Sequence, residues 1–94
     1  MIDTKTLNFI RFATGHNNLK AEELEAFVEN EVEELNGYSS DLAFTVDDIN
    51  NNQTLRGYVI EGLLLTLQTR WGNNLDYHVN KRTKYLNKLT GMQV

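Results

Sequence analysis

The stretch LRGYVIEGLLLTLQTRW, residues 55–71, decides the fold of this chain. Wound at about 100° per residue, its apolar residues leave no wide polar side. A helix that is apolar on most sides is buried and is covered by other elements on more than one of them. The run is too short to cross a bilayer, and Arg56, Glu61 and Arg70 interrupt or flank it. We therefore expect a central buried helix around which the other segments fold.

Three glycines predict how this helix packs and where it ends. Gly57 and Gly62 each weaken a helix by about 1 kcal/mol relative to alanine, so we expect a neighbouring backbone to approach closely at these positions. Gly72, directly after Trp71, predicts a left-handed C-terminal cap.

Length and composition predict one all-α domain. The chain has 94 residues, 40% of them hydrophobic, and it lacks proline while being rich in helix-forming residues. We expect a single domain over residues 1–94, a small bundle of about four helices around the long buried helix. Residues 73–94 would form an irregular C-terminal arm that serves in assembly. There is no cysteine, and the first residues lack the pattern of a signal peptide, so we expect an intracellular protein without disulfides.

Two helices are predicted before residue 38. Asp3 or Thr4 should begin the first, and Gly15 should end it. Its apolar positions by spacing are Leu7, Ile10 and either Phe12 or Ala13, with Phe9 beside them. The second should cover residues 19–36, with Asn18 as N-cap and Asn36-Gly37 as its end.

The second predicted helix has one apolar and one acidic face. The apolar positions follow helical spacing and are Leu24, Phe27, Val28, Val32 and Leu35. The opposite face carries Glu22, Glu23, Glu25, Glu29, Glu31, Glu33 and Glu34. Such a face is either solvated, or directed at something basic, or kept acidic to avoid adhesion to nucleic acid.

The remaining segments give weaker patterns. Residues 45–48 have the form of a capping box with Asp48 in place of glutamate, and Leu42, Phe44 and Ile49 should pack on the core. After Gly72 we expect an irregular or extended segment to about Lys81, although the apolar spacing there also suits a helix. A closing helix should then cover residues 83–89 and end at Gly91.

Charge is distributed unevenly along the chain. Residues 1–50 carry eleven acids against three basic residues, a net charge of −8, whereas residues 51–94 carry six basic residues against two acids, a net +4. Either an acidic helix packs near a basic tail within one molecule, or the two faces join neighbouring copies. The second arrangement is heterologous and closes into rings or runs on as filaments.

No motif predicts catalysis, a cofactor or a metal site. There is no glycine-rich phosphate loop, no HExxH and no nucleophile motif, and the acidic cluster at residues 47–52 lacks the glycine and glutamate of a calcium loop. The two histidines, His16 and His78, stand apart from each other. We expect no catalytic, cofactor-binding or metal-ligating residues, and hence no enzyme.

The order of elements resembles the small head–tail connector, or adaptor, proteins of tailed bacteriophages. The matching parts are a short first helix (TKTLNFIRFA), an acidic helix that ends in a glycine-aromatic pair (LKAEELEAFVENEVEELNGY), a long apolar helix (TLRGYVIEGLLLTLQTRWGN) and a short closing helix (TKYLNKLTGM). The resemblance implies a structural protein of the virion neck, made in the host cytoplasm. Copies would form a homo-oligomeric ring on the portal protein, extend the DNA channel without sequence-specific binding or any membrane contact, and dock the tail or tail-completion protein.

Two hypotheses about surfaces follow. In the connector, the residues that we expect at subunit or partner interfaces are Glu25, Glu29, Glu33, Arg70, Lys81, Arg82, Lys84, Tyr85 and Lys88. The alternative is a small helical regulatory or protein-interaction module, whose basic-aromatic cluster at residues 77–88 could contact nucleic acid.

Overall fold

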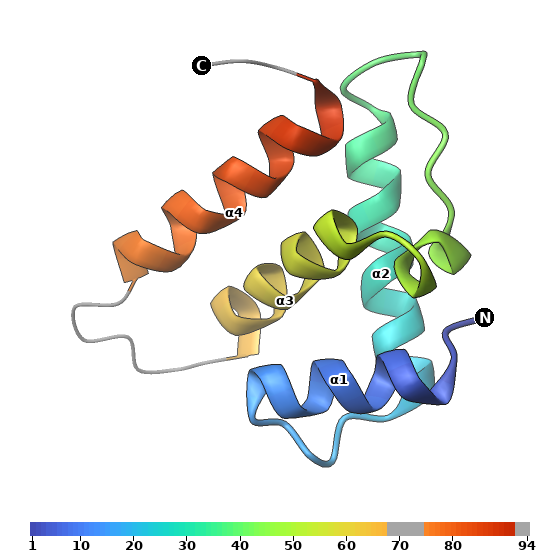
Figure 1. Ribbon diagram of the computed structural model, residues 1–94, viewed down its shortest axis with the longest axis vertical. Coiled ribbons are helices and arrows are strands. Elements are labelled where there is room, and N and C mark those ends of the chain that lie inside the picture. The colour runs from blue at the N-terminus through green and yellow to red at the C-terminus, as the bar shows by residue number, and fades with distance from the viewer. Residues whose placement is uncertain (68–74, 92–94) are drawn as a thin grey trace.

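A computed structural model of the chain describes residues 1–67 and 75–91, and every regular element in these residues is helical (Figure 1). The elements are α1 (Thr4–Thr14), α2 (Ala21–Asn36), the 3₁₀ helix η1 (Val46–Asn50), α3 (Gln53–Leu67) and α4 (Leu75–Thr90). The prediction of an all-α bundle of about four helices is confirmed.

The helices form a slab two layers thick. The molecule measures 35 × 33 × 18 Å, and two packed helices with their side chains account for the shortest dimension. Viewed down that direction, α1, α3 and α4 spread across one layer, with α3 between the other two, and α2 crosses behind α3 (Figure 1). One flat side of α3 therefore faces α2, and the other faces away from it.

Helix α1 begins and ends where the sequence predicts. The Thr6 N–H donates to the Asp3 side chain at 2.7 Å, and Gly15 ends the helix with a left-handed φ of 73°. The prediction for its apolar face was partly wrong. Leu7 and Ile10 are buried, but the side chain of Phe12 is 87% exposed. Threonines complete the buried face instead, because the Thr14 hydroxyl donates to the Ile10 carbonyl within the helix and needs no outside partner.

The N-cap of α1 makes the stability of the fold depend on pH. Hydrogen bonds from Thr6 hold the pKa of the Asp3 carboxyl below its ordinary value. Asp3 therefore stabilises the fold above the pKa of the unfolded chain, about 3.9, and this contribution is lost as pH falls through the lower folded-state pKa. We expect the difference in Tm between wild type and Asp3→Asn, which keeps an acceptor but cannot ionise, to shrink between about pH 5 and about pH 2. A difference that stays constant over this range would contradict the assignment.

Helix α2 starts later than predicted. It begins at Ala21 with Lys20 as N-cap, so the assignment of Asn18 was wrong. Asn18 lies instead in a turn that the Leu19 N–H closes by donating to the His16 carbonyl at 3.2 Å. The helix ends at Gly37 as expected, but with a right-handed φ of −72°.

The segment after α2 is fastened by one amide side chain. The Asn36 side chain donates to the Phe44 carbonyl and accepts from the Phe44 N–H, both at 2.9 Å. The Thr45 N–H then donates to the Asp48 carboxylate at 2.8 Å, which confirms the capping box. These bonds return the chain to the core, where Ile49 is fully buried.

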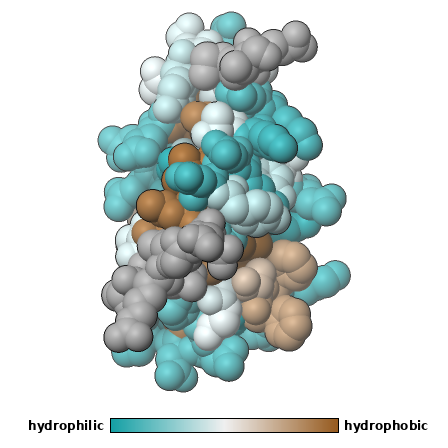
Figure 2. All heavy atoms as spheres, turned by 90° about the vertical axis from the view of Figure 1, so that its left-hand side faces the viewer, coloured by the Kyte–Doolittle hydropathy of each residue, from teal (hydrophilic) through white to brown (hydrophobic). Residues whose placement is uncertain are grey.

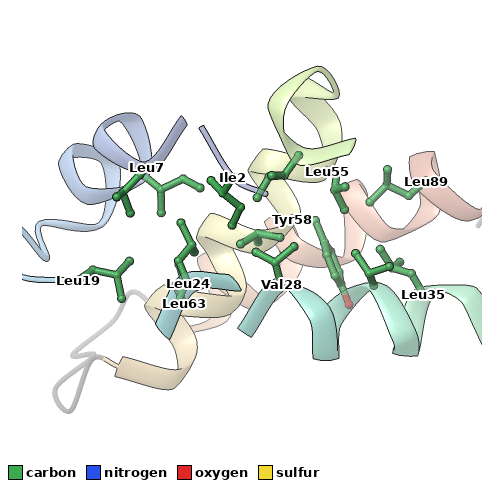
Figure 3. Packing of buried hydrophobic residues seen from close by; sticks show 14 residues of the cluster. Ile2, Leu7, Leu19, Leu24, Val28, Leu35, Leu55, Tyr58, Leu63 and Leu89 are labelled. Atoms are coloured by element: carbon green, nitrogen blue, oxygen red, sulfur yellow. The ribbon is translucent and has the colours of Figure 1, made fainter. Parts of the chain in front are cut away.

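The core lies between α2 and the layer of α1, α3 and α4. Figure 3 shows Tyr58 between Val28 and Leu35, with its hydroxyl oxygen directed toward α2. The buried hydrophobic residues are Ile2, Leu7, Ile10, Leu19, Leu24, Val28, Val32, Leu35, Ile49, Leu55, Tyr58, Val59, Leu63 and Leu89. Fully burying such a side chain stabilises the fold by about 1.5–3 kcal/mol.

The prediction of an irregular arm before residue 83 was wrong. Helix α4 is continuous over Leu75–Thr90, lies along α3, and ends at Gly91 with a left-handed φ of 74°. The alternating pattern at Leu75, Tyr77 and Val79 covered only three positions, and all three side chains are exposed in the helix. Contacts with α2 and α3 decide the conformation instead. The predicted cap at Gly72 and the interface residue Arg70 lie outside the described residues.

Candidate interaction surfaces

One buried carboxylate of α2 is paired with α4. Glu31 is only 9% exposed, so of the alternatives for the acidic face it fits contact with the basic segment of the same molecule rather than a solvated position. The Arg82 guanidinium donates to Oε2 of Glu31 at 2.9 Å and to the Tyr58 hydroxyl at 2.7 Å, and its carbon lies 4.4 Å from the centre of the Tyr58 ring. Burial raises the pKa of Tyr58 well above its ordinary value despite the adjacent guanidinium, so the hydroxyl stays neutral. Arg82 of α4 thus connects that helix to both α2 and α3 within one molecule.

A second buried carboxylate, on α3, is also paired with α4. Glu61 is 3% exposed, and its Oε2 lies 2.5 Å from Nδ1 of His78 while its Oε1 lies 3.5 Å from Nζ of Lys81. Partial burial lowers the pKa of Lys81, but attraction by Glu61, Tyr77 and Tyr85 outweighs it and leaves the pKa raised. Part of the basic segment therefore neutralises acids within the same molecule.

The sequence did not pair His78 with an acid, although one feature pointed to it. A glutamate inside an otherwise apolar, buried helix needs a partner, because an isolated charge is costly to bury. Glu61 is that glutamate, and its partners are His78 and Lys81, one to two turns into α4. What the sequence lacks is the relative register of α3 and α4.

The glycines of α3 leave room for side chains of α2 and α4. The prediction that a neighbouring backbone approaches closely at Gly57 and Gly62 was therefore wrong. A Cβ on Gly57 would lie 2.5 Å from the Tyr85 ring, and one on Gly62 would lie 3.2 Å from Oε1 of Glu31 and 3.3 Å from the Phe27 ring. Tyr85 is therefore an internal packing residue. Both α2 and α4 approach α3 at positions where alanine would already be crowded.

The other predicted interface residues divide by exposure. Glu29 and Glu33 on α2 and Lys84 and Lys88 on α4 are exposed. Glu25 is partly exposed, with Oε1 4.0 Å from the N-terminal amine. Within the part of the chain that the structure describes, two exposed surfaces of opposite charge thus remain: an acidic α2 surface of Glu29 and Glu33, and a basic α4 surface of Lys84 and Lys88.

Chemistry at the paired carboxylates is limited. A carboxylate that orients an imidazole, as Glu61 does His78, is part of a general-base arrangement. Yet no serine or threonine is among the described residues that line the adjoining groove, and the chain has no cysteine. Within residues 1–67 and 75–91, no three metal-ligating side chains gather at one place, and no helix is both long and apolar enough to span a bilayer.

Comparisons of the chain with known protein families, curated proteins and solved structures found no match.

Proposed function

We propose that the protein is a structural component of a bacteriophage virion, a subunit of the ring between portal and tail. Such a ring extends the DNA channel and provides the surface on which the tail or tail-completion protein docks. The resemblance of the helix order to head–tail connectors motivates the proposal. The observation that carries it is that, among the described residues, an exposed acidic surface and an exposed basic surface lie on one small subunit.

The argument from charge has two steps. Glu31, Glu61, Lys81 and Arg82 already pair internally, so they supply little attraction to a neighbour. The acidic α2 surface and the basic α4 surface remain available and belong to different helices. A contact between unlike surfaces of identical copies is heterologous, and repetition with rotation closes a ring. Acidic side chains not used between subunits would repel the DNA backbone and let it pass.

Solution mass measured by light scattering at low and high salt tests this assembly. We expect a discrete oligomer that dissociates as salt rises, because exposed charge pairs are screened beyond about 8–10 Å at 0.1–0.15 M salt. Reversal of the basic surface (Lys84→Glu, Lys88→Glu) or of the acidic surface (Glu29→Lys, Glu33→Lys) should each abolish the oligomer. Mixing the two reversed proteins should restore assembly with alternating copies, since the all-acidic protein then meets the all-basic protein at every contact, and the fourfold variant should assemble on its own. Failure of that rescue would contradict the proposed contact.

The alternative is a helical interaction module that contacts nucleic acid through α4. Tyr77, Lys84 and Lys88 favour it, because they border one shallow surface on that helix. Binding to an oligonucleotide that weakens steeply with salt would support this function. A salt-insensitive dimer without nucleic-acid affinity would indicate a protein-binding module instead.

A further inference from the structure

Helix α3 is apolar on a side that the described chain leaves partly open. At about 100° per residue, Gly57, Ile60 and Leu64 lie on the opposite side of α3 from Leu55 and Gly62, which face the core and α2. Ile60 and Leu64 are only partly buried. The slab has α2 on one side of α3 and no second layer of described residues on the other. Because a helix that is apolar on most sides is normally buried, we expect another element to cover this open side of α3 as well.

This open side is the floor of a groove of about 420 Å³ between α1 and α4. Phe9 and Ala13 of α1 form one wall, and Tyr77 and Tyr85 of α4 form the other. The walls are accessible, since Phe9 is 54% and Tyr77 59% exposed. Figure 2 looks onto the neighbouring edge of the molecule, where apolar side chains reach the surface along the middle and again at the lower right.

The charges around this groove are more positive than negative although the protein carries a net charge of −4. Arg56 and Lys81 line it, and Lys5 and the helix-capping Asp3 border a hollow that shares Phe9 and Arg56 with it. The acid that lines the groove, Glu61, is buried and already paired. Arg56 is held in place by donating to the Ile49 and Asn50 carbonyls at 3.1 and 3.0 Å. An apolar floor thus lies between cations fixed to different helices.

We infer that this groove binds an amphipathic helix of another protein, with acidic residues beside its apolar face. The floor covers residues 53–64 of α3, about 18 Å of helix, so the bound segment should be about three turns long. Apolar side chains at i, i+3 or i+4, and i+7 would enter between the aromatic walls. Carboxylates beside them would meet Arg56 and Lys5.

A second copy of the chain and nucleic acid fit the groove less well. Helix α2 is the acidic amphipathic helix of the chain, but its apolar residues Leu24, Val28 and Leu35 are fully buried in its own core. Nucleic acid would find aromatic walls and cations, yet an aliphatic floor offers no hydrogen bonds to base edges. The inference does not depend on ring formation, because the acidic α2 surface and the basic α4 surface lie outside the residues that line the groove.

Selection from a display library of random 14-residue peptides, followed by affinity measurements on synthetic peptides, tests the inference. We expect the selected peptides to be amphipathic and acidic, to gain helicity on binding, and to shift the amide NMR signals of α1, α3 and α4 at the groove. Phe9→Asp and Ala13→Trp, at exposed positions in one wall, should each lower affinity at least tenfold. The matched control is Phe12→Asp, on the same helix but outside the groove, and it should bind within about twofold of wild type.

Several outcomes would overturn the inference. They are the absence of any selected binder, binders whose affinity is unchanged by Phe9→Asp and Ala13→Trp, or binders without acidic residues. Oligothymidylate binding that is lost in Ala13→Trp would assign the groove to nucleic acid, and a fall in solution mass in Phe9→Asp would assign it to a second copy. Because Glu29, Glu33, Lys84 and Lys88 stay unchanged in these variants, failure here is distinguishable from failure of the ring.

Discussion

Replacing Arg82 with alanine is expected to lower the free energy of unfolding by about 2–3 kcal/mol. The variant would leave Glu31 in a largely buried site without its ion partner, a change that typically costs 3–5 kcal/mol for a fully buried pair. We place the effect below that range because the Arg82 side chain is 28% exposed. The guanidinium would also be lost from the face of the Tyr58 ring. Urea unfolding monitored by circular dichroism measures the change.

Two control variants separate the lost pair from general effects of mutating α4. Lys84→Ala removes an exposed cation from the same helix and should change stability by about 0.5 kcal/mol or less. The double variant Arg82→Ala, Glu31→Gln should recover part of the loss, because the amide is cheaper to bury than an unpaired carboxylate. Strictly additive effects of the two single substitutions would show that Glu31 and Arg82 are not coupled.

Gly57→Ala is expected to destabilise the protein by about 1–3 kcal/mol, although alanine favours a helix over glycine by about 1 kcal/mol. The added Cβ would lie 2.5 Å from the Tyr85 ring, so the ring and with it α4 must move away from α3. Amide hydrogen exchange should accelerate in α4 more than in α2. Denaturant unfolding measures the change in the free energy of unfolding. A decrease shows that crowding against Tyr85 dominates, and an increase shows that helix propensity dominates.

The compensating substitution makes this second prediction specific. Tyr85→Leu removes the ring atoms that the new Cβ would meet, so Gly57→Ala should become neutral or stabilising in that background. Gly57→Ala that is equally destabilising with leucine at position 85 would contradict the packing described here.

Local patterns in the sequence predicted local structure well. The cap at Asp3, the end at Gly15 and the capping box at Thr45 each depend on groups within four residues of one another, and each is present. Apart from the N-cap wrongly assigned to Asn18, the main failures concern partners that are distant along the chain. Arg82 and Glu31 are 51 residues apart, and nothing near either residue shows that they meet.

The same distinction explains the mistakes about α4 and α1. The residues of α4 alone fit a helix or an extended segment, and pairing with Glu61 and Glu31 determines the choice. Spacing in α1 could not separate Phe12 from the buried residues, because that requires knowing which side faces α3. For the candidate surfaces, the sequence supplied the charges, whereas the structure shows which charges are already neutralised.

The double hydrogen bond between Asn36 and Phe44 makes the loop between them a suitable place for a label. The amide ties both ends of the loop at 2.9 Å, so added residues near Ser40 or Asp41, both exposed, would not pull on α2 or η1. Lengthening such a closed loop costs only about 0.6 kcal/mol per doubling. A short epitope inserted there would therefore mark the position and orientation of each copy in electron micrographs of any assembly, while both charged surfaces and the groove keep their side chains.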